Sequence, residues 1–573
     1  MKYIVDGKEV QLTQKEFIAD GGEADVYGIY HQTPHKDYLG TAYKIYKDLS
    51  KVLTYQKFQE LSVLSHPNIV KPEHSILKKE KVVGYTMNLI QGYGLCQLFT
   101  KSFKQRNGLT EDKILDLTKK FKNIISFIHS KGILVVDLNE FNFLVNNSFD
   151  ELYAIDVNSY QTPSFPATVI LPSVYDHHCH NKFNENTDWF SWAVLITQLF
   201  IGIHPYKGTY ADFDGMTMAD KLNARMDKNI SCFNKKVSLP KMCASFDVIP
   251  PNLRSWLFAV LEEGKRLPPP NDFENIVVNL VKQIKGSNLF NVIKLEEFPQ
   301  NITGYHYFDG CRCTSTKDFV FYKNQKHNLP TKEKCEFIFL PKENKLLAVY
   351  LENKLCFHDF STSKKILLES NVEEFFKVDN RLYVRNGMQI LEVNFLNFND
   401  NLKPTLKLVA NILDVPGATK TFDGVIFQNM LGKIYISIFP KSGMCIQNKI
   451  DEFDKLKILD AKYENKILVV LAVNKKGEHS RFILKYSDDF KNYEITQTTG
   501  IEQPNINFTV SEKGIVLFLN EKEEIEVFFN QYQNNKVQVM QDPFITGEMN
   551  LTHDGNKFMF YLKNELFSIA SKA

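Results

Sequence analysis

The hydrophobic and polar positions of the chain follow a different pattern in each half. In the first half, strand-like runs such as residues 1–12, around an Asp6-Gly7 turn, precede a long apolar run at 189–203. This run, interrupted by Ser191, Thr197 and Gln198, predicts a buried helix. From about residue 290, helical periodicity stops, and short alternating runs lie between turns rich in Asn, Asp, Lys and Gly. The sequence therefore predicts a multidomain chain with an α+β first half and an all-β second half.

The all-β half repeats one unit, which consists of a turn, a strand, a turn and a strand. Residues 344–350 and 354–357 form one such pair, and similar pairs begin near residues 380, 432, 465, 514 and 556. Recurrence at roughly 35 to 50 residues is typical of a β-propeller with four-stranded blades, and six or seven blades fit this length. A β-sandwich pair or another irregular β domain is the alternative, because no WD or kelch signature marks the blades. We find no catalytic constellation here, which favours a domain that binds a partner or substrate protein.

Composition and charge narrow the class of protein. A chain of 573 residues is too long for a single ordinary core, so two or three domains are expected. The net charge is only +2 and no run of five basic residues occurs, which argues against nucleic acid as a partner. Nine cysteines without a CxxC pair argue against a disulfide framework and favour a reducing compartment.

The sequence also argues against export and membrane insertion. Residues 1–12 lack the apolar core of a secretion signal. The longest apolar run, residues 189–203, is shorter than the ~20 residues that a membrane span needs. We therefore expect a cytoplasmic protein with no membrane partner, and the oligomeric state stays open.

Two short segments carry polar residues at a specific spacing. Asp137 and Asn142 lie five residues apart, and Asp156 follows after a turn. A lone pair of this kind would mean little, because Asp and Asn are common in turns. With the glycines upstream, however, the pattern resembles the active site of the protein kinase superfamily. There the first Asp orients and deprotonates the accepting hydroxyl, the Asn holds a metal, and the next Asp bridges metal and ATP phosphates.

The resemblance extends to the nucleotide loop and covers about residues 10–285. Residues 19–27 resemble the glycine-rich loop, although only the middle one of the usual three glycines is kept. Gly21 and Gly22 would let backbone N–H groups approach phosphate oxygens, and Lys44 on the next strand would reach the α and β phosphates. The Gly-Gly-Glu loop and the Asp-Val-Asn-Ser-Tyr-Gln segment at residues 156–161 are similar to a divergent bacterial branch of the superfamily.

The resemblance assigns roles to particular residues. The catalytic set is Lys44, Asp137, Asn142 and Asp156, with Mg²⁺ or Mn²⁺ held by Asn142 and Asp156. The ATP-binding set is Gly21, Gly22, Glu23, Val26, Ala42, Lys44, Glu60, Met87, Leu89 and Leu144. In this set Val26 and Ala42 would cover the adenine, Met87 and Leu89 would form the hinge beside it, and Leu144 would lie beneath it.

Three further features resemble structural parts of a kinase. Residues 66–70 resemble the turn after helix αC, Asp188 would anchor the catalytic loop, and Arg266 resembles the arginine that closes the C-lobe. The usual distance from the αC glutamate to that turn lands on Lys57, so we expect Glu60, one helical turn later, to pair with the phosphate-binding lysine.

Departures from the family pattern bear on mechanism. Val135 and Val136 replace the usual His-Arg, which argues against activation by phosphorylation of the activation loop. Asn139 stands where the family has a lysine, which leaves one cation fewer for the transferring phosphoryl group. Asn158 replaces the glycine of Asp-Phe-Gly. Because Asn tolerates left-handed backbone angles, this replacement is compatible with metal binding by Asp156.

Residues 176–180, Asp-His-His-Cys-His, contain zinc-ligand types. Adjacent residues rarely point to one tetrahedral centre, and structural zinc sites use spaced pairs. The cluster follows the expected end of the activation segment, so a solvated loop that contacts substrate is the better interpretation.

The sequence thus predicts a bilobal kinase fold followed by a β-propeller-like domain. The expected divisions are an N-lobe at residues 1–88, a C-lobe at 89–285, a connector at 286–304 and the β domain at 305–573. The expected activity is ATP-dependent phosphorylation of Ser or Thr hydroxyls on a protein that the β domain recruits. A nucleotide-binding pseudokinase scaffold is one alternative, and a small-molecule kinase is a second.

Overall fold

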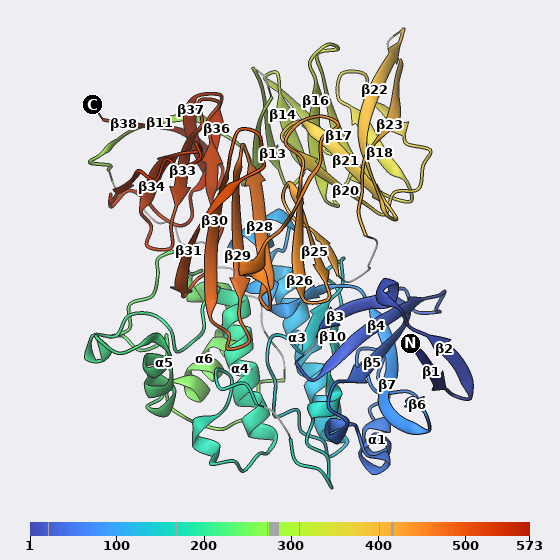
Figure 1. Ribbon diagram of the computed structural model, residues 1–573. Coiled ribbons are helices and arrows are strands. Elements are labelled where there is room, and N and C mark those ends of the chain that lie inside the picture. The colour runs from blue at the N-terminus through green and yellow to red at the C-terminus, as the bar shows by residue number, and fades with distance from the viewer. Residues whose placement is uncertain are drawn as a thin grey trace.

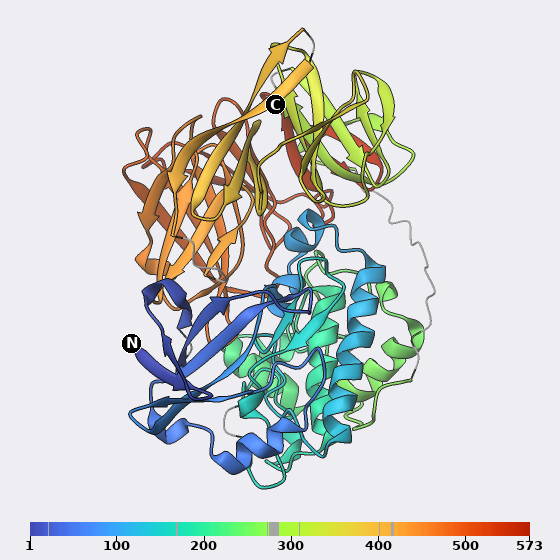
Figure 2. The ribbon, with the colours of Figure 1, turned by 90° about the vertical axis from the view of Figure 1, so that its right-hand side faces the viewer.

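The computed structural model divides the chain into two regions, one α+β and one all-β (Figure 1). It describes residues 1–20, 22–167, 170–271, 273, 286–308, 310–399, 401–413 and 418–572. Figure 2 shows the helices gathered in the α+β region (residues 1–273), with the curled sheets of the all-β region (residues 286–572) stacked on it. The division of the chain into α+β and all-β halves is confirmed.

The strand-rich part of the α+β region is one antiparallel sheet. Its described strands are β1 (Lys2–Val5), β2 (Lys8–Gln11), β3 (Phe17–Asp20), β4 (Ala24–Tyr30), β5 (Tyr38–Tyr46), β6 (Ser75–Lys78) and β7 (Lys81–Ile90). They lie in the order β2-β1-β6-β7-β5-β4-β3. The hairpin expected around Asp6-Gly7 is confirmed, and helix α1 (Tyr55–Ser62) is inserted between β5 and β6. Because β7 runs to Ile90, the sheet extends past the expected boundary at residue 88.

The helical part surrounds one buried helix. Its described helices of more than three residues are η3 (Leu95–Phe99), α2 (Lys101–Arg106), α3 (Glu111–Ser130), α4 (Glu185–Ile201), α5 (Met218–Asp227) and α6 (Pro251–Leu261). A small sheet of β8 (Tyr93–Gly94), β9 (Phe143–Val145) and β10 (Leu152–Ala154) accompanies them. Asn184 caps the N-terminus of α4 by accepting the backbone N–H groups of Asn186 and Thr187, and Gly202 ends the helix with φ +82°. The apolar side chains of α4 lie in the largest core, as the apolar run predicted.

The described part of the all-β region forms seven four-stranded antiparallel sheets in chain order. Sheet 1 is β12 (Ile302–Phe308), β13 (Cys311–Thr316), β14 (Phe319–Tyr322) and β15 (Gln325–Asn328); sheet 2 is β16 (Cys335–Leu340), β17 (Lys345–Leu351), β18 (Leu355–Asp359) and β19 (Lys364–Leu367). Sheet 3 is β20 (Glu374–Val378), β21 (Arg381–Asn386), β22 (Gln389–Phe398) and β23 (Asn401–Asn411); sheet 4 is β24 (Thr419–Thr421), β25 (Val425–Met430), β26 (Lys433–Ile438) and β27 (Ile446–Lys449). Sheet 5 is β28 (Lys457–Glu464), β29 (Ile467–Val473), β30 (His479–Tyr486) and β31 (Tyr493–Ile501); sheet 6 is β32 (Phe508–Val510), β33 (Ile515–Leu519), β34 (Ile525–Phe529) and β35 (Val537–Met540).

Sheet 7 joins the two ends of the all-β region. It contains β36 (Asn550–Asp554), β37 (Lys557–Leu562), β38 (Glu565–Ser571) and, paired with β38, the first strand β11 (Phe290–Glu297). We expected residues 286–304 to be a connector, but they contain β11 and the start of β12. The pairing partner of β11 lies more than 250 residues later in the chain, so local pattern could not identify it. Residues 272 and 274–285, the expected end of the C-lobe, lie outside the described residues.

Apolar cores link each sheet of the all-β region to the next. Separate clusters join sheets 1 and 2, sheets 2 and 3, sheets 3 to 5, sheets 5 and 6, and sheets 6 and 7. A further cluster joins sheet 7 back to sheet 1 through Met559, Leu566, Ile302 and Tyr305, and β36 also contacts β12. The series of sheets is therefore closed by contacts between its first and last members.

The all-β region docks on the helical part through sheet 5. Asp460, fully buried, forms an ion pair with Arg106 and accepts a hydrogen bond from Ser102 Oγ at 2.6 Å. Gln97 Nε2 donates to the Leu459 carbonyl at 3.0 Å, and β25 contacts β3 of the strand-rich part. Both parts of the α+β region are thereby held against the same face of the all-β region.

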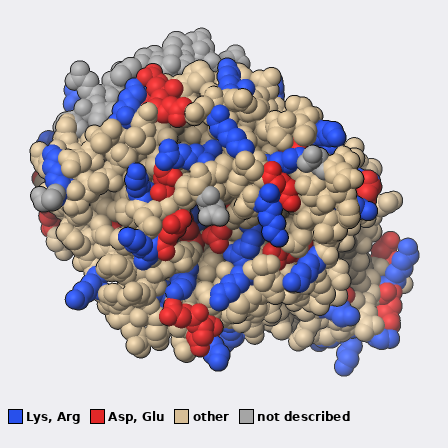
Figure 3. Space-filling model, turned by 90° about the horizontal axis from the view of Figure 1, so that it is seen from above, with Lys and Arg blue, Asp and Glu red and all other residues tan. Residues whose placement is uncertain are grey.

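The face of the all-β region turned away from the α+β region carries both charges, with Lys and Arg interspersed among Asp and Glu (Figure 3). Among the helices that the structure describes, none combines the length and apolar character that crossing a bilayer requires. All nine cysteines are unpaired thiols.

Candidate active site

Asp188 positions the segment that carries Asp137. Its fully buried carboxylate accepts the backbone N–H groups of Val135 and Val136 and bonds His129 Nε2, each at 2.8 Å. Val136 has a left-handed backbone, with φ +60°. Such a conformation is costly for a β-branched residue and persists only where its surroundings impose it. The anchor role expected for Asp188 is confirmed.

Asp137 lies in a nearly closed environment. Asn142 Nδ2 donates to the Asp137 carbonyl at 3.0 Å and to its Oδ2 at 3.3 Å, and the Leu171 backbone N–H donates to Oδ1 at 2.9 Å. Burial raises the pKa of Asp137 above its ordinary value, although these hydrogen bonds act in the opposite direction. A carboxylate with a raised pKa is a better proton acceptor than an exposed aspartate.

Asn142 and Asp156 lie on neighbouring strand ends. The Ile155 N–H donates to the Asn142 carbonyl at 2.9 Å and continues the β9–β10 ladder. Asp156 then turns out of the ladder with φ +62° and ψ +34°. Because the Asn142 amide nitrogen donates to Asp137, its amide oxygen is the atom that would bind a cation.

These oxygen atoms suit Mg²⁺, which takes one or two protein carboxylate or amide ligands and completes its shell with water and phosphate. Among the described residues, no group of three or more His, Cys, Asp or Glu side chains could hold a metal by itself. The donor set of Asn142 and Asp156 therefore fits a metal that arrives with a phosphate ligand.

Lys44 of the strand-rich part contacts Asp156 of the helical part. Its buried ammonium forms an ion pair with Asp156 and donates to Asn158 Oδ1 at 2.8 Å. Tyr85, directly opposite Lys44 in the β5–β7 register, donates its hydroxyl to the same Asn158 oxygen at 2.7 Å. Tyr85 is a neighbour of Lys44 that sequence reasoning missed, since only the register of β5 on β7 places it opposite Lys44.

Glu60 does not pair with Lys44 in the contacts that the structure describes. Its carboxylate accepts the Ser164 N–H at 3.2 Å, and hydrogen bonds from Ser164 lower the pKa of Glu60 to about 2. Lys57, at the position where the family has its glutamate, is buried, and burial lowers its pKa. The rotation of α1 thus directs Glu60 to the activation segment, and Asp156 is the carboxylate that Lys44 contacts.

The expected adenine-contacting residues occupy one face of the strand-rich sheet. Val26 is opposite Lys44, and Ala42 is opposite Met87. Leu89 follows Met87 by two residues and shares that face, because strand side chains alternate. From the helical part, Leu144 lies on β9 between β8 and β10. These positions remain predictions for nucleotide contact.

The nucleotide loop is described except for Gly21, which lies outside the described residues. Glu23 forms an ion pair with Lys51 at 2.7 Å. Gly22 is exposed, and a Cβ atom placed on it would lie 3.5 Å from Lys475 Nζ of the all-β region. A side chain from the second region thus reaches the loop.

The Asp-His-His-Cys-His cluster is dispersed by its contacts. Asp176 receives two hydrogen bonds from the Arg266 guanidinium, both at 2.6 Å. His177 Nδ1 lies 2.6 Å from an Asp227 carboxylate oxygen. The cluster forms no metal site among the described residues. Asp176 instead forms a structural ion pair with Arg266, which its sequence position beside histidines did not indicate.

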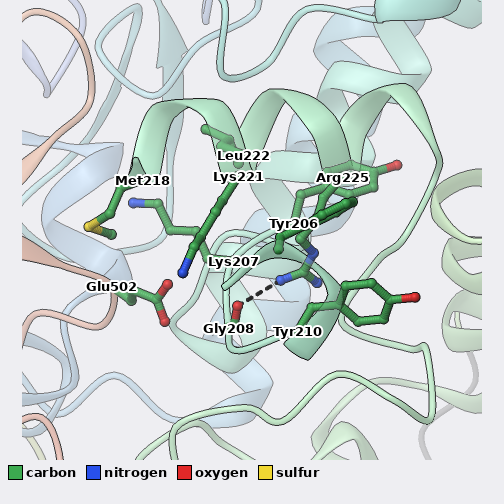
Figure 4. A pocket seen from close by; sticks show the side chains of 10 residues that line it. Tyr206, Lys207, Gly208, Tyr210, Met218, Lys221, Leu222, Arg225 and Glu502 are labelled. Atoms are coloured by element: carbon green, nitrogen blue, oxygen red, sulfur yellow. Dashed lines mark hydrogen bonds between the residues drawn. The ribbon is translucent and has the colours of Figure 1, made fainter. Parts of the chain in front are cut away.

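A separate pocket lies where the loop after α4 and helix α5 meet the all-β region (Figure 4). The Glu502 carboxylate lies beside the side chains of Lys207 and Lys221, and Arg225 Nη1 donates to the Gly208 carbonyl at 3.0 Å. No residue assigned above to nucleotide or metal lines this pocket, so we assign it to the docking of the two regions.

Comparison with known proteins places the similarity in the first half of the chain. No family model matches. The chain is 22% identical over 235 residues to the smooth-muscle myosin light chain kinase of Gallus gallus, covering 39% of this chain and 12% of that protein. It is 26% identical over 186 residues to the serine/threonine-protein kinase YPK3 of Saccharomyces cerevisiae, covering 28% of this chain and 33% of that protein.

A bacterial protein shows the same relation. The serine/threonine-protein kinase PknD of Chlamydia felis is 24% identical over 273 residues, which cover 41% of this chain and 27% of PknD. The chain therefore spans a third or less of the length of these relatives. Together these low-identity similarities support a domain of the protein kinase superfamily in the first half of the chain.

Proposed function

We propose that the chain is an ATP- and magnesium-dependent protein kinase that transfers the γ-phosphate to Ser or Thr hydroxyls of a protein. The observation that carries the proposal is the presence of two pairs of polar side chains beside the same end of the β9–β10 hairpin. Lys44 pairs with Asp156, and Asn142 hydrogen-bonds Asp137, so that both pairs meet at the ends of β9 and β10. The similarity to several serine/threonine kinases favours the same class of reaction.

The side chains divide the work of phosphoryl transfer. The Asp137 carboxylate accepts the proton of the attacking hydroxyl as the new O–P bond forms and the bond to the ADP oxygen breaks. Lys44 neutralises and orients phosphate oxygens as a compact cation. Bound Mg²⁺ supplies charge neutralisation at the phosphates, and Asn142 and Asp156 are the residues that would hold it.

We further propose that the all-β region is a seven-bladed β-propeller that recruits or orients the substrate protein. Seven antiparallel sheets of four strands, the shared sheet 7 and the apolar contacts between consecutive sheets support this architecture. The mixed charges on its outer face fit a protein partner better than a nucleic acid, which requires a basic footprint.

A nucleotide-binding pseudokinase is the second candidate, and one observation favours it. Among the described contacts, Lys44 has no acid from helix α1, and its partner Asp156 is also the expected metal ligand. If the Lys44–Asp156 pair persisted in the nucleotide complex, metal binding would be weakened and transfer would be slow or absent.

Transfer of labelled phosphate from ATP with magnesium separates these candidates. We expect wild type to label itself or a protein in a lysate, and Asp137→Ala to lose at least ~10²-fold in rate while binding ATP nearly as well. Asp116→Ala is the matched control, because Asp116 is an exposed aspartate on α3 whose one ion pair among the described residues is with Lys120. Full transfer by Asp137→Ala would make the catalytic assignment wrong, whereas ATP binding without transfer in wild type would favour the pseudokinase. Labelling of a small molecule alone would favour the small-molecule kinase.

A further inference from the structure

The expected nucleotide site holds few positive charges for a polyphosphate ligand. Lys44 is its buried cation, and Asp137 and Asp156 contribute two carboxylates. Asn139, on the catalytic loop, is neutral, and its Oδ1 accepts the Phe141 N–H at 2.9 Å. ATP brings about four negative charges, and phosphoryl transfer depends on cations placed around them. Another cation near the nucleotide loop would therefore favour binding.

The turn between β29 and β30 brings a lysine to that place. As noted, Lys475 Nζ lies 3.5 Å from the position of a Cβ atom on Gly22. On the other side of the turn, a Cβ atom on Gly477 would lie 3.6 Å from Ser173 Oγ of the helical part. The turn thus lies against both parts of the α+β region, and Figure 1 shows β29 and β30 reaching toward this region.

The turn is held in shape by its own hydrogen bonds. Asn474 Oδ1 accepts the N–H groups of Lys476 at 2.8 Å and Glu478 at 3.1 Å. Asn474 Nδ2 donates to the Glu478 carboxylate at 2.7 Å, so this neighbouring acid is engaged within the turn. Within the residues that the structure describes, no carboxylate forms a salt bridge with Lys475. Its charge is therefore available to an anion beside Gly22.

The docking of sheet 5 fixes where the turn lies. Strand β29 pairs with β28 along its length, and β28 carries the Leu459 and Asp460 contacts to Gln97, Ser102 and Arg106. The turn that carries Lys475 is therefore placed by a buried interface, although the Lys475 side chain itself is exposed.

We propose that Lys475 of the all-β region binds the phosphates of the nucleotide, which makes the active site a composite of both regions. This inference rests on the proposed nucleotide-binding function of the α+β region. It assigns the all-β region a direct part in the chemistry, in addition to the recruitment of a protein.

The test is nucleotide binding by the full chain, measured calorimetrically with a non-hydrolysable ATP analogue and magnesium. We expect Lys475→Ala to weaken binding of the analogue about tenfold and to leave binding of adenosine, which has no phosphates, unchanged. Lys475→Arg should retain most of the affinity. Lys491→Ala is the matched control, because its side chain is 80% exposed in the turn at the other end of the same sheet.

Addition of salt should shrink the difference between wild type and Lys475→Ala, since an exposed charge contact is screened. Asn139→Lys in the Lys475→Ala background should recover part of the affinity by returning a cation to the site.

Equal affinity of Lys475→Ala and wild type for the analogue would overturn the inference. Tighter binding or faster transfer by Lys475→Ala would also overturn it, because the turn would then act as a cover over the site. If wild type bound neither the analogue nor adenosine, the proposed function itself would fail.

Discussion

Asp188 in the α+β region and Asp460 in the all-β region are both fully buried carboxylates, yet they hold different kinds of contact. Asp188 binds backbone N–H groups of the segment that carries Asp137, within one region. Asp460 binds Arg106 and Ser102 across the interface. The first contact determines the geometry of the active site locally, and the second determines which surface of the all-β region faces it. The proposed function depends on both.

The largest effect should follow from Asp188→Ala. The substitution leaves two backbone N–H groups and the His129 ring without a buried acceptor, and each unsatisfied group costs about 1–3 kcal/mol. We expect a loss of about 3 kcal/mol or more in the free energy of unfolding of the α+β region, measured by chemical denaturation. Since the segment that carries Asp137 loses its anchor, transfer should fall at least ~10²-fold.

Asp188→Asn keeps one acceptor oxygen at the same place and serves as the milder variant. Its free energy of unfolding should lie between those of Asp188→Ala and wild type. If Asp188→Ala folded and transferred phosphate as wild type does, the carboxylate would not be what positions Asp137.

The second effect should follow from Asp460→Ala, which leaves the Arg106 guanidinium at the interface without its carboxylate. Breaking a buried pair costs ~3 kcal/mol, and less here because Arg106 is partly exposed. We expect faster hydrogen exchange in η3 and α2, together with weaker binding of the ATP analogue. Asp489→Ala is the control, because Asp489 is 54% exposed in a turn of the same sheet.

If hydrogen exchange and affinity for the ATP analogue were both unchanged in Asp460→Ala, the interface would have no influence on the active site. If docking were lost but affinity for the ATP analogue were unchanged, the role of Lys475 would be contradicted, whereas the proposed function of the α+β region would not. The two aspartates therefore test whether the active site belongs to one region or to both.

The same comparison shows which features a sequence can predict. The helix over residues 189–203, the first hairpin and the catalytic segment depend on neighbours within a few residues, and local pattern was enough for them. The spacing of Asp137, Asn142 and Asp156 reflects one short loop and one hairpin, so their proximity followed from the family pattern. The recurrence of short strand pairs likewise predicted six or seven units in the all-β half, and seven sheets occur among the described residues.

Features that depend on distant partners were not predictable. Strand β11 was taken for a connector because β38, its partner, lies at the other end of the all-β region. Glu60 was expected at Lys44, but the orientation of α1 directs it to Ser164. Lys475 is one of many surface lysines in the sequence, and only the docking of sheet 5 brings it to Gly22. No local pattern encodes these contacts.

Asp137 should make phosphate transfer depend on pH. Burial raises the pKa of Asp137, and a base must be ionised, so transfer should be lost as the pH falls through that raised pKa. The acidic limb of kcat/KM should therefore lie above the ordinary aspartate pKa of about 3.9. A rate that stayed constant down to that pH would contradict this role.

The raised pKa of Asp137 also predicts an effect on stability. A buried carboxyl that favours its neutral form stabilises the fold at low pH and opposes it once the pH exceeds the raised pKa. Asp137→Asn should therefore raise the melting temperature at neutral pH, although it abolishes transfer, whereas Asp188→Asn should lower both.

The smallest effect should follow from Arg312→Ala, at the contact between sheets 1 and 7. Arg312 pairs with Asp554, but its side chain is 62% exposed, and exposed pairs contribute only about 0.2–1 kcal/mol. We expect the free energy of unfolding of the all-β region to fall by about 0.5 kcal/mol in chemical denaturation. Met559→Ala removes a side chain that is 1% exposed from the apolar cluster at the same contact, and it should cost about 2–5 kcal/mol. Equal losses in the two variants would mean that charge and not apolar packing joins the first and last sheets. In that case the exposed Arg312–Asp554 pair would contribute to stability as strongly as the buried Arg106–Asp460 pair at the interface between the two regions.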